Sequence, residues 1–162
     1  MQLTVEPLEA GAFAPFGDVL EPDACRDRRS INAGYTTRFH DLCRLVLDAE
    51  GGQPCLSIFR TRPLPTPLRL TTLERHPLSS QAFYPLSGRG WLVVVAPAGD
   101  LRREAIRAFR ARSDQGVNFH PGTWHHFSLA LEAESDFLVV DRSGGAPDCD
   151  EVELAEPIEI AP

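Results

Sequence analysis

From residue 55 onward the chain consists of short runs of β-forming residues, and most of these runs end at a glycine or a proline. Proline occurs 14 times and glycine 12 times in the 162 residues, which favours frequent turns over long helices. Many short strands at this spacing are typical of a β-sandwich or a β-barrel. We therefore expect an all-β-dominated fold with a few short helices. The expected strands cover residues 55–60, 68–74, 81–86, 91–96, 106–109, 116–119, 125–131 and 136–141.

The length of the chain is typical of one domain. We expect residues 1–162 to form this single domain, with a barrel core at residues 55–142. Residues 1–54 are expected to form an irregular and partly helical and strand-forming extension, with a short helix near Glu9–Phe13 and a polar, irregular segment at 23–38. Residues 143–162 read as a tail that adds a last strand around Val152–Leu154.

All 16 basic residues are arginines, and the chain has no lysine. Imine chemistry on a lysine, including lysine-bound pyridoxal phosphate, is therefore excluded. A complete phosphate-binding loop of the Walker type is excluded as well, because that loop needs a lysine. The formal net charge of −7 argues against nucleic acid as a partner, since nucleic-acid binding needs a basic surface.

The four cysteines stand at wide and irregular spacing, which predicts neither a zinc site nor a disulfide framework. Residues 1–17 contain acidic residues and no long apolar run, so they do not resemble a signal peptide. The longest apolar stretch, residues 91–96, is far too short to span a bilayer. We expect a cytoplasmic protein with no membrane partner.

Two groups of polar residues carry the candidate chemistry. Glu74 and His76 are two residues apart, so they share one face of a strand. Three of the five histidines, His120, His125 and His126, lie within seven residues around a Pro-Gly turn. His125 and His126 are adjacent, and we expect only one of them to face a barrel interior.

The first group, Glu74-x-His76 followed by Gln81 and Gly88, resembles the first sequence motif of the cupins. In this resemblance Glu74 replaces a histidine and Gln81 replaces a glutamate. Residues 116–125 resemble the second cupin motif, with His125 at the histidine position. The resemblance implies a cupin-like β-barrel, or jelly roll, whose interior holds Glu74, His76, Gln81 and His125.

Longer strings are similar to the ureidoglycolate lyase family. They are Glu-Arg-His-Pro-Leu-x-x-Gln-Ala-Phe at 74–83, Gln-Gly-Val-Asn-x-His at 115–120, Trp-His-His at 124–126, Asp-Phe-Leu-x-x-Asp-Arg at 136–142 and Asp-Cys-Asp at 148–150. The resemblance covers essentially the whole chain. It implies a homodimer that cleaves the small molecule (S)-ureidoglycolate into glyoxylate and urea, a step of allantoin degradation in purine metabolism.

This reaction needs a base for the hydroxyl proton, an acid for the departing urea nitrogen, and donors for the substrate carboxylate. Histidine and glutamate suit the proton transfers near neutral pH, so we expect His76, His125 and Glu74 to be catalytic. We expect Arg60, Gln81 and Asn118 to bind substrate. Arg60 is favoured for the carboxylate because a planar guanidinium donates two parallel hydrogen bonds.

The same interior positions form a candidate metal site with Glu74, His76, Gln81 and His125 as ligands. Family resemblance points to Ni²⁺, for which imidazole is a suitable ligand, while catalysis that requires no cofactor stays open. Two other functions also stay open. One is a non-catalytic cupin that binds a small organic acid, and the other is a metal-dependent cupin enzyme acting on another small substrate.

Overall fold

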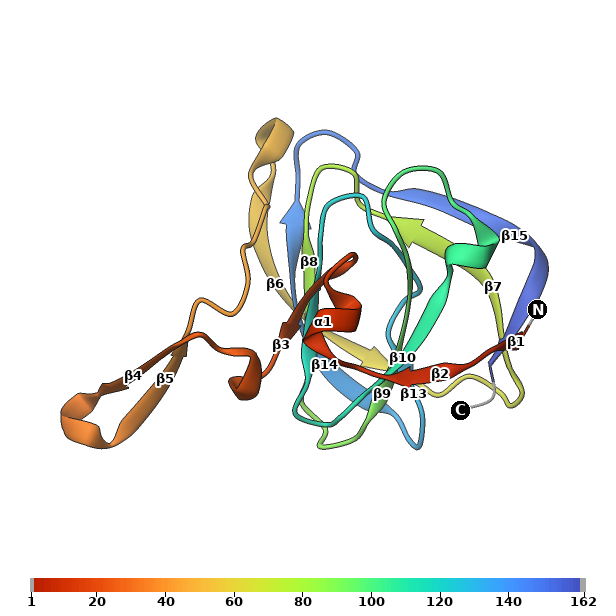
Figure 1. Cartoon of the computed structure of the whole chain (residues 1–162). Coiled ribbons are helices and arrows are strands. Elements are labelled where there is room, and N and C mark those ends of the chain that lie inside the picture. Colours follow the sequence, from red (N-terminus) through yellow and green to blue (C-terminus); the bar gives the residue numbers. More distant parts are fainter. Residues whose placement is uncertain (1, 161–162) are drawn as a thin grey trace.

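Two β-sheets form the body of the molecule in the computed structural model, which describes residues 2–160 (Figure 1). The first sheet follows the order β3, β11, β8, β14, β6. The second follows the order β1, β15, β7, β12, β9, β10, β2, with β13 paired to β9. Most neighbouring strands are antiparallel and distant in sequence, as in a jelly roll, which confirms the predicted cupin-like, all-β-dominated fold.

The strand bounds are as follows. The first sheet contains β3 (Gly17–Leu20), β11 (Gly116–Phe119), β8 (Gln81–Pro85), β14 (Ser135–Ser143) and β6 (Gln53–Thr61). The second contains β1 (Gln2–Leu3), β15 (Asp150–Ile160), β7 (Leu68–Arg75), β12 (Trp124–His125), β9 (Trp91–Ala96), β10 (Arg107–Ala111), β2 (Val5–Pro7) and β13 (Leu129–Ala130).

Strand β9 coincides with the longest apolar run of the sequence, residues 91–96. All six of its residues are buried, because both faces of this strand are covered. Trp91, Val93 and Val95 pack with aromatic residues of the five-stranded sheet in one core cluster. The alternate residues Leu92, Val94 and Ala96 join a second cluster with leucines of β7. The first cluster fills the space between the two sheets, and its member Phe119 stacks against His125.

The short helix expected near residues 9–13 is present as α1 (Ala10–Phe13). Its Phe13 is completely buried and meets Phe109 edge to face, with the ring centroids 5.5 Å apart. The other helical elements are single 3₁₀ turns: η1 (Pro22–Ala24), η2 (Asn32–Gly34), η3 (Ala49–Gly51) and η4 (Arg103–Ala105). Among residues 2–160, no helix is both long and apolar enough to cross a membrane.

Parts of the chain outside residues 55–142 also belong to the two sheets. Strands β1, β2 and β3 each pair with a strand of the body, and β15 extends the predicted tail strand to Asp150–Ile160. The expected strand at 125–131 is divided into β12 and β13, which both pair with β9.

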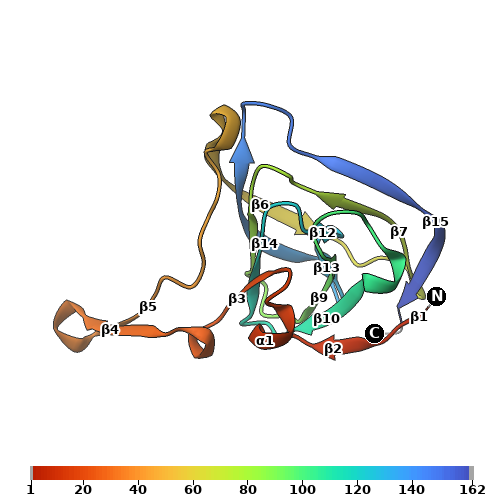
Figure 2. The same ribbon diagram turned by 45° about the horizontal axis from the view of Figure 1, so that its top comes forward.

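The segment at 23–38 differs from the expected irregular structure. It contains an antiparallel hairpin of β4 (Asp27–Ile31) and β5 (Thr36–His40), which we call the arm (residues 27–40). Figure 2 shows the arm projecting from the body. Most residues of the arm are exposed, so neither of its faces carries the apolar alternation that would reveal a strand in the sequence.

Candidate active site

Glu74, His76 and His125 meet at the point where β12 lies beside β7. His125 pairs directly with Glu74 in this register, and His76 follows the end of β7 by one residue. The His76 and His125 ring centroids are 5.3 Å apart, and Glu74 Oε1 lies 3.8 Å from His125 Nδ1. One ligand atom from each of the three residues falls within 4.8 Å of the others. The three side chains with predicted catalytic roles therefore form one cluster.

His125 is held as a neutral imidazole. Its side chain is 1% exposed, and its ring stacks on Phe119 with a centroid separation of 4.4 Å. Burial, assisted by the nearby His76, lowers the pKa of His125 to about 3. Its Nδ1 lies 3.4 Å from the backbone carbonyl of His126, whereas its Nε2 is buried and has no hydrogen-bond partner among the described residues.

His76 has a defined tautomer. Its Nδ1 lies 2.6 Å from the carbonyl oxygen of Asp148. A carbonyl oxygen can only accept a hydrogen bond, so Nδ1 carries the proton and Nε2 of the neutral ring has the lone pair. That Nε2 is buried and makes no hydrogen bond to the described residues. His76 therefore presents a basic nitrogen to the site.

The pKa of Glu74 is shifted upward, whereas that of His125 is shifted downward. Burial raises the pKa of this carboxyl group, and the negative charge of Glu151 adds to the effect, while His76 opposes it. The Glu74 side chain remains 31% exposed, so protons can reach it from solvent. A basic imidazole and a carboxyl group with a raised pKa are the pair that general acid–base catalysis requires.

A cavity of about 370 Å³ opens beside this cluster, and its lining includes His76, Gln81, Asp141, Arg142 and Asp148. Glu74 and His125 line a smaller hollow of about 60 Å³. Gln81 is almost completely buried; its Nε2 lies 3.5 Å from Asp141 Oδ2 and its Oε1 has no partner among the described residues. The structure thus brings Gln81 to the same cavity as His76.

The structure does not bring Arg60 to this cavity. Arg60 stands opposite Asp136 in the β6–β14 ladder, and its Nε and Nη2 lie 2.8 and 2.9 Å from the two Asp136 carboxylate oxygens. The cavity residue Asp141 is five residues further along β14. The Arg60 side chain is 66% exposed. The sequence predicted that Arg60 lies at the end of a strand. Which end of the sheet this is depends on how β6 pairs with β14, and the pairing places Arg60 away from the cavity.

Asn118 also lies outside this cavity. Its neighbours Val117 and Phe119 point into the core cluster between the sheets, so Asn118 points to the opposite face of β11. There its Nδ2 donates to Asp18 Oδ2 at 3.0 Å and to the Arg44 carbonyl at 3.3 Å. The prediction that Asn118 faces the interior with His125 is corrected by this alternation.

Arg142 and Asp148 are among the cavity residues that received no site role from sequence reasoning. The Arg142 guanidinium donates to the carbonyl oxygens of Ala49, Glu50 and Ala146 instead of pairing with the adjacent Asp141. Asp148 accepts a hydrogen bond from the Leu78 N–H at 2.6 Å through Oδ1. Asp148 lies in a tail loop with no strand pattern, and the Asp-Cys-Asp string was its only signal.

The cluster fits a divalent metal ion. Glu74 offers a carboxylate, and the unpartnered Nε2 atoms of His76 and His125 offer two imidazole ligands. The other ring nitrogens face backbone carbonyls, which is the usual support of metal-binding histidines. Such a mixed nitrogen and oxygen donor set is suitable for Ni²⁺ and similar ions. Gln81, the fourth candidate ligand, presents its unpartnered Oε1 from the cavity on the side of His76.

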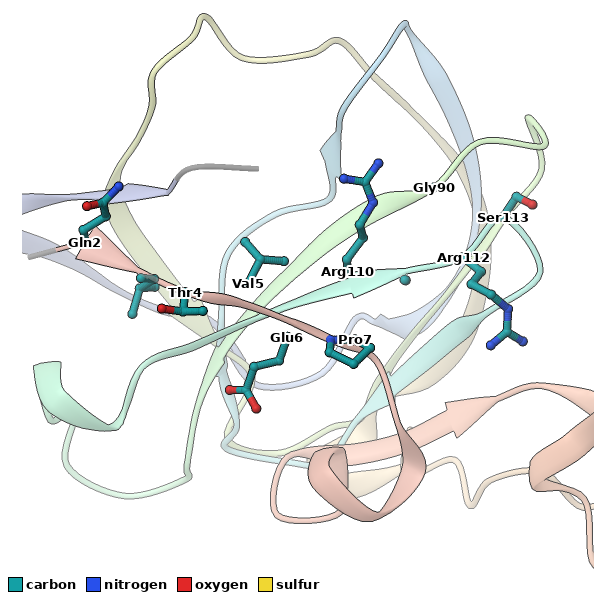
Figure 3. Close-up of a pocket in the computed structure, with 11 residues that line it drawn as sticks. Gln2, Thr4, Val5, Glu6, Pro7, Gly90, Arg110, Arg112 and Ser113 are labelled. Carbon is teal, nitrogen blue, oxygen red and sulfur yellow. The ribbon is translucent and has the colours of Figure 1, made fainter.

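A more spacious pocket, of about 870 Å³, lies away from this cluster between β2 and β10. Figure 3 shows Glu6 and Arg110 pointing in opposite directions from it. The Glu6 carboxylate is occupied by Arg107, at 3.0 Å to Nε and 2.6 Å to Nη2. No histidine or cysteine is among the described residues that line it. Size alone therefore does not identify the site of chemistry.

Comparison with known proteins assigns the family. The family model described as ureidoglycolate lyase matches residues 1–161. A protein named ureidoglycolate lyase from Burkholderia cepacia is 50% identical, covering 99% of this chain and 92% of its own length. One of the same name from Pseudomonas syringae pv. syringae (strain B728a) is 52% identical over 96% of this chain and 91% of its own length. The match of both the model and these relatives over nearly the full chain shows that the protein belongs to the ureidoglycolate lyase family.

Proposed function

We propose that the protein is a lyase that cleaves (S)-ureidoglycolate into glyoxylate and urea, as a step of allantoin degradation. Family membership supports this function, since the relatives carry the name ureidoglycolate lyase. The observation that carries the proposal is the cluster of Glu74 with two imidazoles whose buried Nε2 atoms make no hydrogen bond to the described residues. Buried polar groups without partners are costly, so they are expected where they serve a function.

The reaction is an elimination at the carbon that carries both the hydroxyl and the ureido group. His76 Nε2 takes the hydroxyl proton, and the oxygen's electron pair forms the aldehyde C=O of glyoxylate. The C–N bond breaks, and the departing nitrogen takes a proton and leaves as urea. Glu74 is suited to deliver this proton because its pKa is raised by burial. The stacked, neutral His125 orients the substrate through Nε2.

A divalent ion such as Ni²⁺ would be held by Glu74, His76 and His125, with Gln81 as a further ligand on the His76 side. When bound, it would act as a Lewis acid that stabilises the charge developing on the substrate oxygen. A bound ion would occupy the His76 Nε2 lone pair and the Glu74 carboxylate, so the proton transfers assigned above describe the cofactor-free enzyme.

The substrate carboxylate needs a cation inside a protein with a net charge of −7. Arg142 is the arginine that lines the cavity with His76 and Gln81, and we assign it this role in place of Arg60. Its four hydrogen bonds to backbone carbonyls occupy four of its five N–H groups. The remaining N–H can donate to the substrate, and the carbonyl contacts hold the guanidinium in place.

The test is an assay of ureidoglycolate that measures urea and glyoxylate separately, with and without a chelator. We expect equal amounts of the two products. Replacing His76 with alanine should lower turnover at least about 100-fold, as is usual when an acid–base group is lost. Replacing His125 with alanine removes the ring that orients the substrate and should also lower turnover. His40→Ala, in the arm, is the matched control and should retain activity. Release of ammonia instead of urea would contradict the lyase.

The same assay separates the alternatives. A non-catalytic binding protein would bind ureidoglycolate without turnover, and a cupin enzyme for another substrate would leave it unchanged. If the chelator abolishes activity and Ni²⁺ restores it, the metal-bound form is the active one.

We also propose that the protein is a homodimer in the cytoplasm. Supporting the dimer, the outer face of β6 and β14 is apolar: Leu56 and Ile58 are 68% and 54% exposed, beside Leu138 and Val140 in register. A contiguous apolar face of this kind is typical of an interaction surface. Supporting the compartment, all four cysteines are free thiols, as expected in a reducing environment.

A further inference from the structure

Two hydrogen-bond acceptors in the cavity have no assigned role in the acid–base chemistry. Asp148 Oδ2 and Gln81 Oε1 are both buried and have no partner among the described residues. Both residues line the 370 Å³ cavity with His76. The observation is independent of the Glu74–His76–His125 cluster, because it concerns oxygen atoms that neither move a proton in the proposed mechanism nor pair with a donor.

The fold holds both acceptors rigidly. The second carboxylate oxygen of Asp148, Oδ1, accepts from the Leu78 N–H at 2.6 Å, and its backbone carbonyl accepts from His76 Nδ1 at 2.6 Å. Gln81 is 5% exposed, and its Nε2 lies 3.5 Å from Asp141 Oδ2, which turns Oε1 the other way. The acceptors therefore keep their orientation before any ligand arrives.

The ureido end of the substrate carries the hydrogen-bond donors that these two acceptors lack. A –NH–CO–NH₂ group carries three N–H donors, whereas the carboxylate and the glyoxylate product carry only acceptors at neutral pH. Two buried acceptors would repel the carboxylate and attract the ureido nitrogens. Arg142, in the same cavity, has the opposite preference.

We propose that Asp148 Oδ2 and Gln81 Oε1 form the subsite for the ureido group and determine the specificity for a terminal carbamoyl group. The inference rests on the proposed function in its cofactor-free form, in which Gln81 Oε1 is not a metal ligand. Asp148 has a double role: its backbone positions His76 as the base, and its carboxylate selects the leaving group. A site built around a buried acceptor discriminates strongly against a ligand without the matching donor, because the acceptor then stays unpaired.

The experiment uses two unreactive ligands that differ only at this end. N-carbamoylglycine has the carboxylate and the ureido group of the substrate, without the hydroxyl that reacts. N-acetylglycine has a methyl group in place of the terminal NH₂. Calorimetric titration of the wild-type protein should show N-carbamoylglycine binding at least about tenfold more tightly, the effect of one hydrogen bond to a charged acceptor.

Asp148→Asn is the informative variant. It keeps Oδ1 for the Leu78 N–H but replaces the acceptor Oδ2 with a donor NH₂. We expect the preference for N-carbamoylglycine to fall to about twofold or less. The change of net charge affects both anionic ligands alike, so the ratio of affinities isolates the acceptor. Asp150→Asn is the matched control, because Asp150 pairs with Arg75 outside the cavity, and it should leave the ratio unchanged.

Three results would overturn the inference while leaving the lyase intact. They are equal binding of the two ligands by a wild-type protein that cleaves ureidoglycolate, an unchanged ratio in Asp148→Asn, and the same fall in Asp150→Asn. Thermal unfolding of both variants shows whether they are folded. If Asp148→Asn does not fold, Gln81→Met removes the second acceptor and must lower the same ratio. Absence of turnover in the wild-type protein would instead count against the proposed function.

Discussion

At the scale of the residue, the environment decides what each histidine can do. His76 and His125 are the same residue type and their rings are 5.3 Å apart, but they have different surroundings. His76 donates from Nδ1 to a carbonyl, which defines it as a base at Nε2. His125 is buried against Phe119, which excludes its charged form. The sequence shows that both residues are present, whereas their protonation follows from contacts made across the fold.

Burial of His125 predicts a pH-dependent stability. The folded state lowers its pKa from 6.5 to about 3, so the neutral form is favoured and the unfolded chain binds more protons between these values. The free energy of unfolding contributed by His125 is therefore complete above pH 6.5 and is lost as the pH falls toward 3. Between pH 7 and pH 5 this loss amounts to about 2 kcal/mol.

The measurement is urea unfolding of the metal-free protein at several pH values. Between pH 7 and pH 5, the free energy of unfolding of the wild-type protein should fall by about 2 kcal/mol more than that of His125→Gln. Since the variant retains Glu74, the opposing effect of that group cancels in the comparison. Parallel curves for the two proteins would show that His125 is not buried in its neutral form.

At the scale of the element, the strands could be predicted but their partners could not. Runs such as 116–119 and 91–96 coincide with β11 and β9, because alternation and apolar runs are local properties. The position of β3 against β11 is not local. Gly17 pairs with Phe119, and a Cβ on Gly17 would overlap the Asn118 carbonyl oxygen and lie 3.1 Å from the Phe119 Cα. This pairing tolerates no side chain.

Gly17→Ala should therefore push β3 away from β11. We expect a loss of about 1–3 kcal/mol in the free energy of unfolding, the usual range for an overpacked site. Gly11→Ala is the control, since a Cβ there has nothing within 4 Å and Gly11 lies in α1. That variant should be neutral or up to about 1 kcal/mol more stable. Equal effects of the two substitutions in denaturant unfolding would contradict the close approach of β3.

At the scale of the whole molecule, the five-stranded sheet has an apolar outer face that the chain covers only in part. A pocket of about 330 Å³ on this face is lined almost entirely by apolar side chains, among them Leu42, Leu45, Leu138 and Val140. Leu56 and Ile58 continue the face on β6. Such a surface is unfavourable in water, which is the physical basis for proposing the dimer.

Ile58→Glu should convert the dimer to a monomer, because it buries a charge in the proposed interface. Sedimentation velocity at micromolar concentration gives the state directly. Val152→Glu, at an exposed position of β15 in the other sheet, is the control and should remain a dimer. A wild-type monomer, or an Ile58→Glu protein that is still dimeric, would exclude this face as the interface.

The strands, the short helix α1 and the all-β character were accessible from local patterning, because alternation, apolar runs and turn residues act over a few positions. The cupin-like fold was implied by the resemblance of two motifs. The cupin resemblance implied that Glu74, His76 and His125 lie together, as the structure shows. Only the tertiary structure showed that Arg60 pairs with Asp136, that Asn118 faces away, and that Asp148 and Arg142 line the cavity. Strand pairing and the path of the tail join residues that are distant in sequence, such as His76 and Asp148, which are 72 positions apart, and register is a property of the assembled sheets.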